Sequence, residues 1–392
     1  MNLFPTYKRF PINIVSGKGT VVTDENGKDY LDFVSGIAVC NLGHCPENVK
    51  QAVEDQMEKI WHVSNLYQLP EQEEAASWLT RFTELDHVFF CNSGAEANEA
   101  AIKLARKYTG KEKIYSFKQS FHGRTFATMS ATGQEKIQQG YGTLLPTFEY
   151  LPYNDPEAVN NLTDENTAAI MVEVIQGEGG VIPGSSEFLQ AVQKKCEQLN
   201  CLLIIDEVQT GIGRTGYPFA YQHHHLDPDI VTSAKGLGSG FPVGAMLGKS
   251  KLKASFSAGA HGTTFGGNPL ATAAVTATLN TIFNDSFLKG VRDKGAAFKQ
   301  TLETKLAPFD LVETIRGQGL MIGIVLKEAA MPLLQKLQEL GLMTVLAGPN
   351  VIRLLPPLTV TESELNQASE LLETAIKQYQ DSLYSQTTGS KK

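Results

Sequence analysis

The sequence predicts an α/β protein with a mostly parallel sheet flanked by helices, and a smaller α+β domain built from both termini. Three observations lead to this fold class. Short apolar runs without polar alternation, such as Leu202–Ile205, indicate strands that are buried on both faces. Between about residues 65 and 285 such runs alternate with amphipathic segments, as is typical of a parallel sheet covered by helices. Beyond residue 286, strands and helices mix without that alternation.

The chain is predicted to have three parts. Residues 1–64 form an N-terminal segment that packs with the small domain, and residues 65–285 form the large domain that carries the binding site. Residues 286–392 form the C-terminal small domain. A long helix at about 287–306 connects the large domain to the small one.

Local signals predict the individual elements. Asn26-Gly27 between short apolar pairs predicts a hairpin turn, and apolar residues spaced by four predict a helix after Pro46. A helix also follows Gly94 and stops at Gly110. Further helices are predicted at 187–199, from Pro269, at 287–306, at 331–340 and from Thr361. Strands are predicted at 88–91, 113–117, 148–151, 168–174, 201–205, 230–232, 243–247, 312–315, 320–326, 343–346 and 351–355. We expect the C-terminal SQTTGSKK to form a frayed tail.

Composition and charge argue against several classes of protein. The chain of 392 residues has a net charge of −8, so it lacks the excess of basic residues that is typical of nucleic-acid-binding proteins. It contains no run of about 18 apolar residues that could span a membrane, and its N-terminus lacks the apolar core of a signal peptide. Five cysteines without paired spacing indicate reduced thiols and a cytoplasmic location. We therefore expect small-molecule substrates, and neither nucleic acid nor a membrane as a partner.

An acid and a lysine lie at the ends of two predicted strands. One buried strand stops at Asp206, and Lys235 follows a later one. Because ligands bind at the carboxyl ends of strands in an open parallel sheet, this pair fits a pyridoxal phosphate site. There the lysine forms a Schiff base, and the acid keeps the pyridine nitrogen protonated. A lone lysine after a strand is usually a solvated surface residue, but Gly236, Gly238 and Gly240 allow a close approach that such a residue does not need.

Two nearby patterns resemble binding motifs without the required context. Residues 211–216 match the dinucleotide fingerprint G-x-G-x-x-G, but they do not follow the strand directly, and Tyr217-Pro218 disfavours a helix after them. We interpret them as a glycine-rich loop. His223–His225 could suggest a metal, but three consecutive histidines cannot all face one ion, and no other Cys or His supports a site. We predict an exposed loop there and no metal.

Three other segments offer groups that could bind a phosphate or a carboxylate. Residues 92–99 cross from a strand end into a helix N-terminus, where free amides and the helix dipole favour an anion. Taken alone, this segment fits an ordinary helix cap better than an anion site, and the phosphate-bearing cofactor proposed above reverses that preference. The loop at 120–125 combines Phe121, which can stack on a pyridine ring, with Arg124, which can clamp a carboxylate or simply be solvated. Residues 261–269 form a glycine-rich turn whose hydroxyls and amides could take a phosphate.

Five motifs together resemble the class-III, or ω-, aminotransferases, which use pyridoxal phosphate. They are NSGAEANEAAIKLAR, FHGRT, IIDEVQTGIGRTG, SAKGLGSGFPVGA and HGTTFGGNP, in the order expected for the family. The resemblance covers about residues 10–380 and implies fold type I of pyridoxal phosphate enzymes, in agreement with the alternation described above. One departure is visible. The family commonly has His-Pro after Gly-His-Cys, whereas Pro46 follows Cys45 directly here, which affects the local turn rather than the chemistry.

The resemblance implies roles around the cofactor. Lys235 would form the Schiff base and move the proton, and Asp206 would pair with the pyridinium nitrogen. The implied contacts to the rest of the cofactor are Val208 and Phe121 on the two ring faces, Gln209 at the ring hydroxyl, and the amides of Gly94 and Ala95 at the phosphate, with Thr264 from the neighbouring subunit. The last contact implies an obligate homodimer with shared active sites.

The resemblance also implies a reaction. The segment GIAVCNLGH and residues 64–67 favour members that act on N-acetylornithine. The reaction would convert N-acetylornithine and 2-oxoglutarate to N-acetylglutamate 5-semialdehyde and glutamate, a step in arginine biosynthesis. Ornithine, succinylornithine, succinyldiaminopimelate and 4-aminobutyrate remain alternative donors, and an aminomutase acting on glutamate semialdehyde is a further alternative. A catalytically inactive scaffold is a different class of alternative, against which the intact Lys235 and Asp206 argue.

One pocket must serve two differently shaped substrates. The donor offers a terminal amine far from its α-carboxylate, whereas the acceptor's keto group is adjacent to its carboxylate. The resemblance implies that Arg124, helped by Thr263, binds the donor's carboxylate, and that Arg353 binds the acceptor's. Glu178 would cover Arg353 during the first half-reaction. The alternative is that Glu178 and Arg353 form only a structural ion pair.

Overall fold

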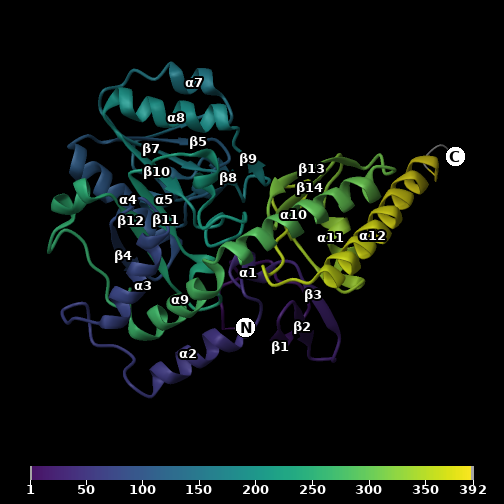
Figure 1. Ribbon diagram of the computed structural model, residues 1–392. Coiled ribbons are helices and arrows are strands. Elements are labelled where there is room, and N and C mark those ends of the chain that lie inside the picture. The colour runs from purple at the N-terminus through teal and green to yellow at the C-terminus, as the bar shows by residue number, and fades with distance from the viewer. Residues whose placement is uncertain (1, 390–392) are drawn as a thin grey trace.

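The computed structural model describes residues 2–389 and shows two bodies joined by the helix α10 (Asp285–Leu306) (Figure 1). One body holds a seven-stranded sheet and most of the helices. The other holds a four-stranded sheet, the last helices and the N-terminal strands. This confirms the predicted class, an α/β body with a smaller α+β part, while the limits at residues 64 and 285 stay predictions.

The large sheet is mostly parallel, as predicted. Its strands, in spatial order, are β4 (His87–Cys91), β12 (Gly244–Gly248), β11 (Ile230–Ser233), β10 (Leu202–Asp206), β7 (Thr167–Glu173), β5 (Lys113–Phe117) and β6 (Phe148–Leu151). Parallel pairing of β10 with β7 and β11 brings Asp206 level with Glu173 and Thr232. β12 runs antiparallel to both β11 and β4, a direction that the sequence did not reveal.

Helices surround this sheet and bury both of its faces. They are α1 (Ser35–Ala38), α2 (Glu47–Met57), α3 (Pro70–Arg81), α4 (Gly94–Thr109), α5 (Phe126–Ala131), α6 (Glu135–Gln138), α7 (Pro156–Asn160), α8 (Ser186–Leu199) and α9 (Pro269–Ile282). In β10, Leu203 and Ile205 belong to the core that includes α8 and α9, whereas Leu202 and Ile204 belong to the core that includes α4. Because side chains alternate along a strand, Asp206 points to the α4 side.

Short elements connect the sheet to the loops. They are the strands β8 (Ile175–Gln176) and β9 (Ile182–Pro183) and the 3-10 helices η1 (Ala220–His224), η2 (Lys235–Gly238) and η3 (Ser250–Phe256). Residues 211–216 form turns with no helix directly after them, which confirms the predicted glycine-rich loop. His223 and His224 lie in the short 3-10 helix η1, so the predicted loop is wrong for these two residues, whereas His225 lies in a turn. His223 and His225 are exposed, as predicted.

The two ends of the chain meet in one small sheet. It contains β1 (Ile14–Lys18), β2 (Val21–Asp24), β3 (Asp29–Asp32) and β15 (Leu342–Met343). The turn at Asn26-Gly27 joins β2 and β3 as an antiparallel hairpin, as predicted, and β3 pairs in parallel with β15. The N-terminal segment therefore pairs directly with the C-terminal part of the chain.

The C-terminal sheet completes the second body. Its strands are β13 (Val312–Gln318), β14 (Met321–Leu326), β17 (Val351–Leu354) and β16 (Val345–Leu346), and its helices are α10, α11 (Met331–Glu339) and α12 (Glu362–Gly389). α12 continues to Gly389, so the predicted frayed tail is wrong for residues 385–389, and residues 390–392 lie outside the described residues. No helix within residues 2–389 is both long enough and apolar enough to cross a membrane.

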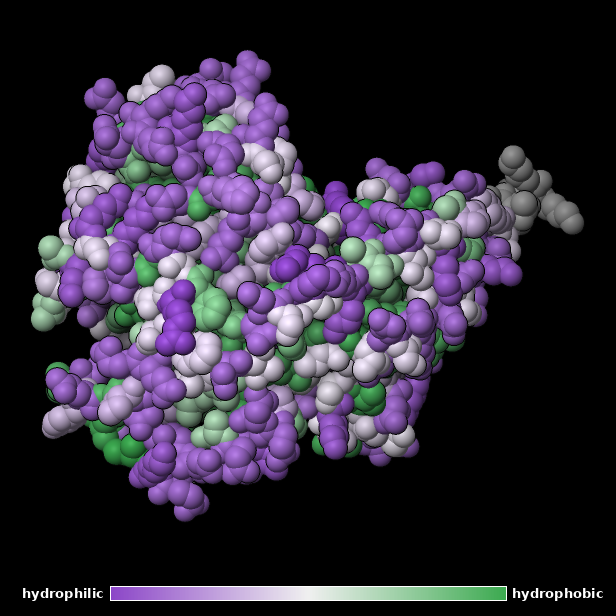
Figure 2. Space-filling model, viewed as in Figure 1, coloured by the Kyte–Doolittle hydropathy of each residue, from purple (hydrophilic) through white to green (hydrophobic). Residues whose placement is uncertain are grey.

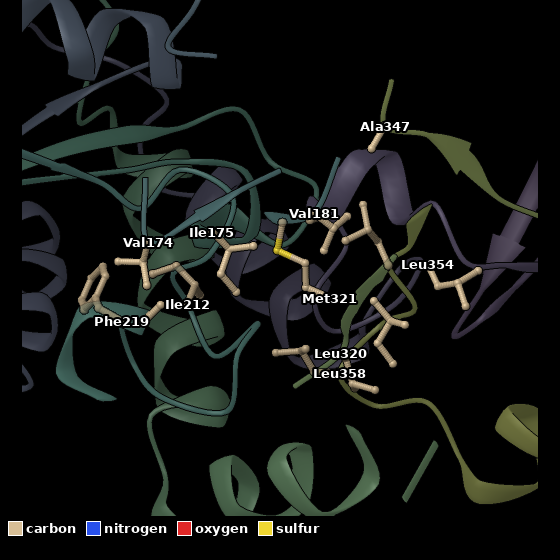
Figure 3. Close-up of a cluster of buried hydrophobic side chains, with 14 of the residues drawn as sticks. Val174, Ile175, Val181, Ile212, Phe219, Leu320, Met321, Ala347, Leu354 and Leu358 are labelled. Atoms are coloured by element: carbon tan, nitrogen blue, oxygen red, sulfur yellow. The ribbon is translucent and has the colours of Figure 1, made fainter. Parts of the chain in front are cut away.

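One continuous hydrophobic core joins the two bodies. Figure 3 shows Val174, Ile175 and Ile212 from the large body near Leu320 and Met321 from the C-terminal part. Full burial of such side chains stabilises the fold by about 1.5–3 kcal/mol each, so the two bodies are held together at this junction. On the outside, hydrophilic side chains cover most of the face seen in Figure 2, and hydrophobic ones show in its middle and at its lower left.

Candidate active site

A cavity of about 440 Å³ lies at the carboxyl ends of β7, β10 and β11. Its wall combines strand ends and loops of the large body with Val39 from the N-terminal segment. The residues predicted from the sequence that line it are Gly94, Ala95, Phe121, Arg124, Glu178, Asp206, Val208, Gln209 and Lys235. The sheet thus gathers at one place groups that are far apart in the sequence.

Asp206 is held firmly at the floor of this cavity. Its Oδ2 atom accepts a hydrogen bond from Asn98 Nδ2 at 2.8 Å and pairs with His122 Nδ1 at 2.8 Å. Its Oδ1 atom accepts from the backbone amide of Val208 at 3.0 Å. Asn98 is itself fixed, because its Oδ1 atom accepts from Thr232 Oγ1 at 2.6 Å. A buried carboxylate with this many partners offers a fixed negative charge to a ligand cation.

The sequence did not assign roles to Asn98, His122 and Glu173, although all three line the cavity. His122 sits inside a motif that was read for its aromatic and arginine neighbours, and Asn98 lies one helical turn after Gly94. The helical spacing from the anion-binding turn was the one available signal for Asn98. Burial, and next the nearby Asp206 charge, raise the pKa of Glu173 well above its usual range.

Lys235 follows β11 as the first residue of η2, in a left-handed backbone conformation with φ of 45°. The residue is partly exposed toward the cavity, but burial of its amine lowers the pKa below 10.5. A lowered pKa favours the neutral amine, which is the nucleophilic form. The next residue must be glycine, because a Cβ atom on Gly236 would lie 2.2 Å from Asn41 Nδ2.

The N-terminus of α4 faces the same cavity. Ser93 caps the helix, because its Oγ atom accepts from the amide of Glu96 at 3.2 Å. The amides of Gly94 and Ala95 precede the first intrahelical bonds and are available to an anion. A Cβ atom on Gly94 would lie 2.7 Å from Val208 Cγ1, so glycine lets the helix end approach Val208 closely.

The loop after β5 supplies an aromatic ring and a cation. Phe121 is anchored by its amide, which donates to Glu173 Oε2 at 3.2 Å. The exposed guanidinium of Arg124 lies 5.6 Å from the centroid of the Phe121 ring. Since Val208 lines the cavity as well, the chain provides apolar groups for two ring faces and a cation for a carboxylate.

Glu178 and Arg353 form a two-pronged ion pair beside the cavity. Arg353 Nη1 donates to Glu178 Oε1 at 2.8 Å, and Arg353 Nη2 donates to Glu178 Oε2 at 3.1 Å. Burial alone would raise the pKa of Glu178, but the charge and hydrogen bonds of Arg353 outweigh it and lower the pKa to about 2. Gln209 bridges the pair, because it accepts from Arg353 Nη1 at 2.8 Å and donates to Glu178 Oε1 at 3.1 Å. Its predicted contact with a ring hydroxyl stays a prediction.

Thr263 and Thr264 do not line this cavity. They line a separate one of about 510 Å³ with Glu96 and Lys103. Thr263 Oγ1 accepts from Asn92 Nδ2 at 3.3 Å, and Asn92 borders both cavities. The structure of one chain therefore does not bring these threonines to Lys235, and their predicted roles stay predictions.

The residues present fit pyridoxal phosphate. A buried amine of lowered pKa, a fixed carboxylate and a helix N-terminus surround one cavity. In addition, His122 Nε2 and Arg353 Nε are buried with no hydrogen-bond partner among residues 2–389, so both atoms remain available to a bound ligand. The model of the family described as Aminotransferase class-III matches residues 4–376.

The chain belongs to the class-III aminotransferase family. Pyridoxal phosphate is accordingly its cofactor. The chain is 59% identical to acetylornithine aminotransferase of Bacillus subtilis (strain 168) over 377 residues, covering 96% of this chain and 97% of the relative. It is 56% identical to acetylornithine aminotransferase of Listeria innocua over 376 residues, covering 96% of this chain and 98% of the relative.

Solved structures of aminotransferases superpose closely on the class-III fold of this chain. Ornithine aminotransferase from Toxoplasma gondii ME49 matches with a TM-score of 0.94 and 31% identity, over 97% of this chain and 94% of that one. N-acetylornithine aminotransferase from Stenotrophomonas maltophilia K279a matches with a TM-score of 0.84 and 34% identity, over 95% and 97%. These similarities confirm the predicted fold type I.

Proposed function

We propose that this enzyme transfers the terminal amino group of N-acetylornithine to 2-oxoglutarate, giving N-acetylglutamate 5-semialdehyde and glutamate. The observation that carries the proposal is the placement of two arginines around one lysine. Arg124 is exposed at the cavity wall, whereas Arg353 is fully buried and paired with Glu178. The relatives at 54–59% identity that are named acetylornithine aminotransferase support this donor.

The chain's own groups divide the chemical work. When bound, pyridoxal phosphate supplies the carbonyl that takes up the amino group and a ring that accepts electrons. Lys235 Nζ, in its neutral form, removes the proton from the amine-bearing carbon of the substrate. Asp206 keeps the ring nitrogen protonated through its fixed charge. The amides of Gly94 and Ala95 bind the phosphate, and Phe121 and Val208 pack on the ring faces.

The two arginines resolve the conflict between the two substrates. If the donor bound Arg353 through its α-carboxylate, its α-carbon rather than its terminal carbon would lie at the reaction centre. With Glu178 covering Arg353, the donor binds through Arg124 and presents its terminal amine to Lys235. The acceptor's carboxylate then displaces Glu178 and binds Arg353 in a bidentate manner.

Ornithine is the second candidate donor. The likeness to ornithine aminotransferase from Toxoplasma gondii, with a TM-score of 0.94, favours it. N-acetylornithine and ornithine share the terminal amine and the α-carboxylate that the two proposed contacts require. They differ in the charge of the α-nitrogen, so comparison of the two amines separates the candidates.

We also propose that the enzyme works as a homodimer, with Thr264 of each subunit completing the phosphate site of the other. Thr264 lies outside the cavity of its own chain, as this arrangement requires. Large apolar side chains are exposed at residues 60–67, beside Arg124 and beside Thr264, and a second copy of the chain would bury them. These side chains are Ile60, Trp61, Leu66, Tyr67, Phe126 and Phe265.

Dilution to monomer should therefore release the cofactor, and monomers that keep it with unchanged affinity would contradict the shared site.

The donor is tested by a half-reaction screen. Purified enzyme loaded with cofactor is mixed with N-acetylornithine, ornithine, succinylornithine, succinyldiaminopimelate or 4-aminobutyrate, and conversion of the pyridoxal absorption band to that of pyridoxamine is followed. We expect N-acetylornithine to convert the band fastest. A faster conversion by any other amine would replace the proposed donor, and no conversion by any amine would indicate an inactive scaffold.

A further inference from the structure

Two cysteines face each other across the end of α8, outside the site described above. Asn200 terminates the helix in a left-handed conformation with φ of 48°. The amide of Cys201 donates to the carbonyl of Cys196 at 3.0 Å, and that of Asn200 donates to the carbonyl of Glu197 at 3.3 Å. This pair of hydrogen bonds is the Schellman motif, in which the side chains at the positions of Cys196 and Cys201 meet. The backbone of the helix end therefore brings two thiols together.

The two cysteines are free and almost fully buried, and the cavity that they line gives a small molecule access to them. Their side chains meet at the helix end, and Cys196 Sγ donates to the carbonyl of Leu202 at 3.7 Å. Both line a cavity of about 310 Å³ that shares no lining residue with the active-site cavity. Lys249 and Lys251 line the same cavity, together with Asp227 and Asp229, with which they form ion pairs of 2.6 Å and 2.5 Å.

The surroundings make the two sulfurs chemically different. Lys111 Nζ donates to the carbonyls of Leu199 and Asn200 at 2.7 Å and 3.1 Å, which fixes a cation beside Cys201. The neighbouring Cys196 side chain lowers the pKa of Cys201 against the effect of burial, and Lys111 lowers it further. Burial raises the pKa of Cys196 well above its usual range. Because the thiolate is the nucleophile, Cys201 reacts first and Cys196 second.

We propose that Cys196 and Cys201 form a modification site for hydrogen peroxide, at which the two thiols close reversibly to a disulfide. The Cys201 thiolate attacks one peroxide oxygen, the O–O bond breaks, and the leaving hydroxide takes a proton to become water. The sulfur of Cys196 then displaces the hydroxyl group of the sulfenic acid at Cys201, so that an S–S bond forms and a second water leaves with the thiol proton. The two thiols lose two electrons and two protons, and hydrogen peroxide is reduced to two waters.

The chain contains internal controls for this site. Cys91 is also buried, but burial raises its pKa to about 12, and its sulfur donates to the carbonyl of Ser93. Cys45 is exposed. If accessibility alone decided reactivity, Cys45 would react first. If the pairing of thiols decides, only Cys196 and Cys201 form an intramolecular bond.

The test uses the full-length enzyme loaded with cofactor and fully reduced. It is treated with hydrogen peroxide, denatured, and alkylated with N-ethylmaleimide before intact-mass measurement and peptide mapping. We expect two fewer alkylated cysteines, a cross-linked peptide spanning residues 196–201 that has lost two hydrogen atoms, and recovery of both thiols with dithiothreitol. In Cys196→Ala the sulfenic acid at Cys201 should persist and be trapped by dimedone, whereas Cys201→Ala should lose the reaction.

The outcomes separate the proposal from general oxidation and from the proposed transamination. A Cys45→Ser variant removes the exposed thiol and should leave the cross-link unchanged. Full alkylation of Cys196 and Cys201 after peroxide treatment, or a cross-link that involves Cys91 or Cys45 instead, would overturn the proposal. Because the readout is thiol content rather than turnover, the result does not depend on which amine the enzyme uses.

Discussion

At the β10 end of the cavity, Asp206 is almost fully buried and accepts hydrogen bonds from Asn98, His122 and a backbone amide. Elsewhere in the cavity wall, Glu178 keeps 27% of its side chain exposed and is held by Arg353 and the side-chain amide of Gln209. The first carboxylate is fixed from several directions by elements of one sheet body. The second depends chiefly on one cation that comes from the C-terminal body.

This difference suggests a division between a fixed end and an exchangeable end. The cofactor stays bound through both half-reactions, so its acid must not move, and a rigid network serves this purpose. The two substrates alternate, so the group that selects between them must be able to leave its partner. When a substrate carboxylate replaces Glu178 at Arg353, one bidentate ion pair is exchanged for another, which keeps the free-energy cost of switching small.

The largest effect is expected from Lys235→Ala at the fixed end. The variant should still bind pyridoxal phosphate through the phosphate, Asp206 and stacking contacts. Turnover should fall at least about 100-fold, because proton transfer by a positioned base alone contributes roughly 10²–10⁴-fold. Turnover and cofactor content are measured on the same sample. A variant that keeps a tenth of the rate would show that another group carries the proton.

Asp206→Asn should have the next largest effect. It removes the charge while keeping the shape, and the loss of a charge-assisted hydrogen bond costs about 1.5–3 kcal/mol, or roughly 10- to 100-fold in rate. The loss of the protonated ring nitrogen adds to this. Glu207→Gln is the matched control, because the neighbouring Glu207 carboxylate is bonded to Thr210 and to the amide of Tyr221 instead. Equal losses in the two variants would contradict the assignment of Asp206.

Glu178→Ala should change selectivity more than rate. With Arg353 uncovered, glutamate should become a better donor relative to N-acetylornithine. The gain should be about 10-fold if Glu178 disfavours binding of a substrate carboxylate at Arg353 by roughly 1.4 kcal/mol. The ratio of the two single-turnover rates measures this effect. An unchanged ratio would show that Glu178 and Arg353 form only a structural ion pair.

The smallest effect concerns pH. The pKa of Glu178 is lowered from 4.5 to about 2, so the pair's stabilisation is fully present above about pH 4.5 and is lost as the pH falls toward 2. The difference in free energy of unfolding between the enzyme and Glu178→Gln should therefore stay constant from neutral pH down to about 4.5. A difference that shrinks already near neutral pH would mean that protonation of Glu178 takes part in switching.

The sequence predicted helices, strands and the functional residues at their ends better than contacts between residues far apart in the sequence. The strands of the large sheet lie within one residue of their predicted ranges, because continuous apolar runs mark buried strands clearly. Asp206 and Lys235 were found for the same reason, since each follows such a run. The antiparallel direction of β12 could not be read, because the strand pattern is the same in both directions.

The rest of the site depends on contacts between distant segments. Asn98 and His122 reach Asp206 across separations of 108 and 84 residues, and no local pattern marks such an encounter. Arg353 reaches Glu178 across 175 residues, and this pair was predicted only through the resemblance to a family. Thr264 shows the limit of a single chain, because its predicted role requires a second subunit.

The most direct test of the account is single-turnover kinetics of both half-reactions in Arg353→Ala and Arg124→Ala. We predict that Arg353→Ala slows the 2-oxoglutarate half-reaction about 100-fold and the N-acetylornithine half-reaction by less than about threefold, as expected from the loss of one charged pair. Arg124→Ala should show the reverse, so each variant controls for the other. The double variant Glu178→Gln, Arg353→Ala checks that an unpaired Glu178 is not the cause. Equal losses in both half-reactions for Arg353→Ala would contradict the division between a fixed end and an exchangeable end.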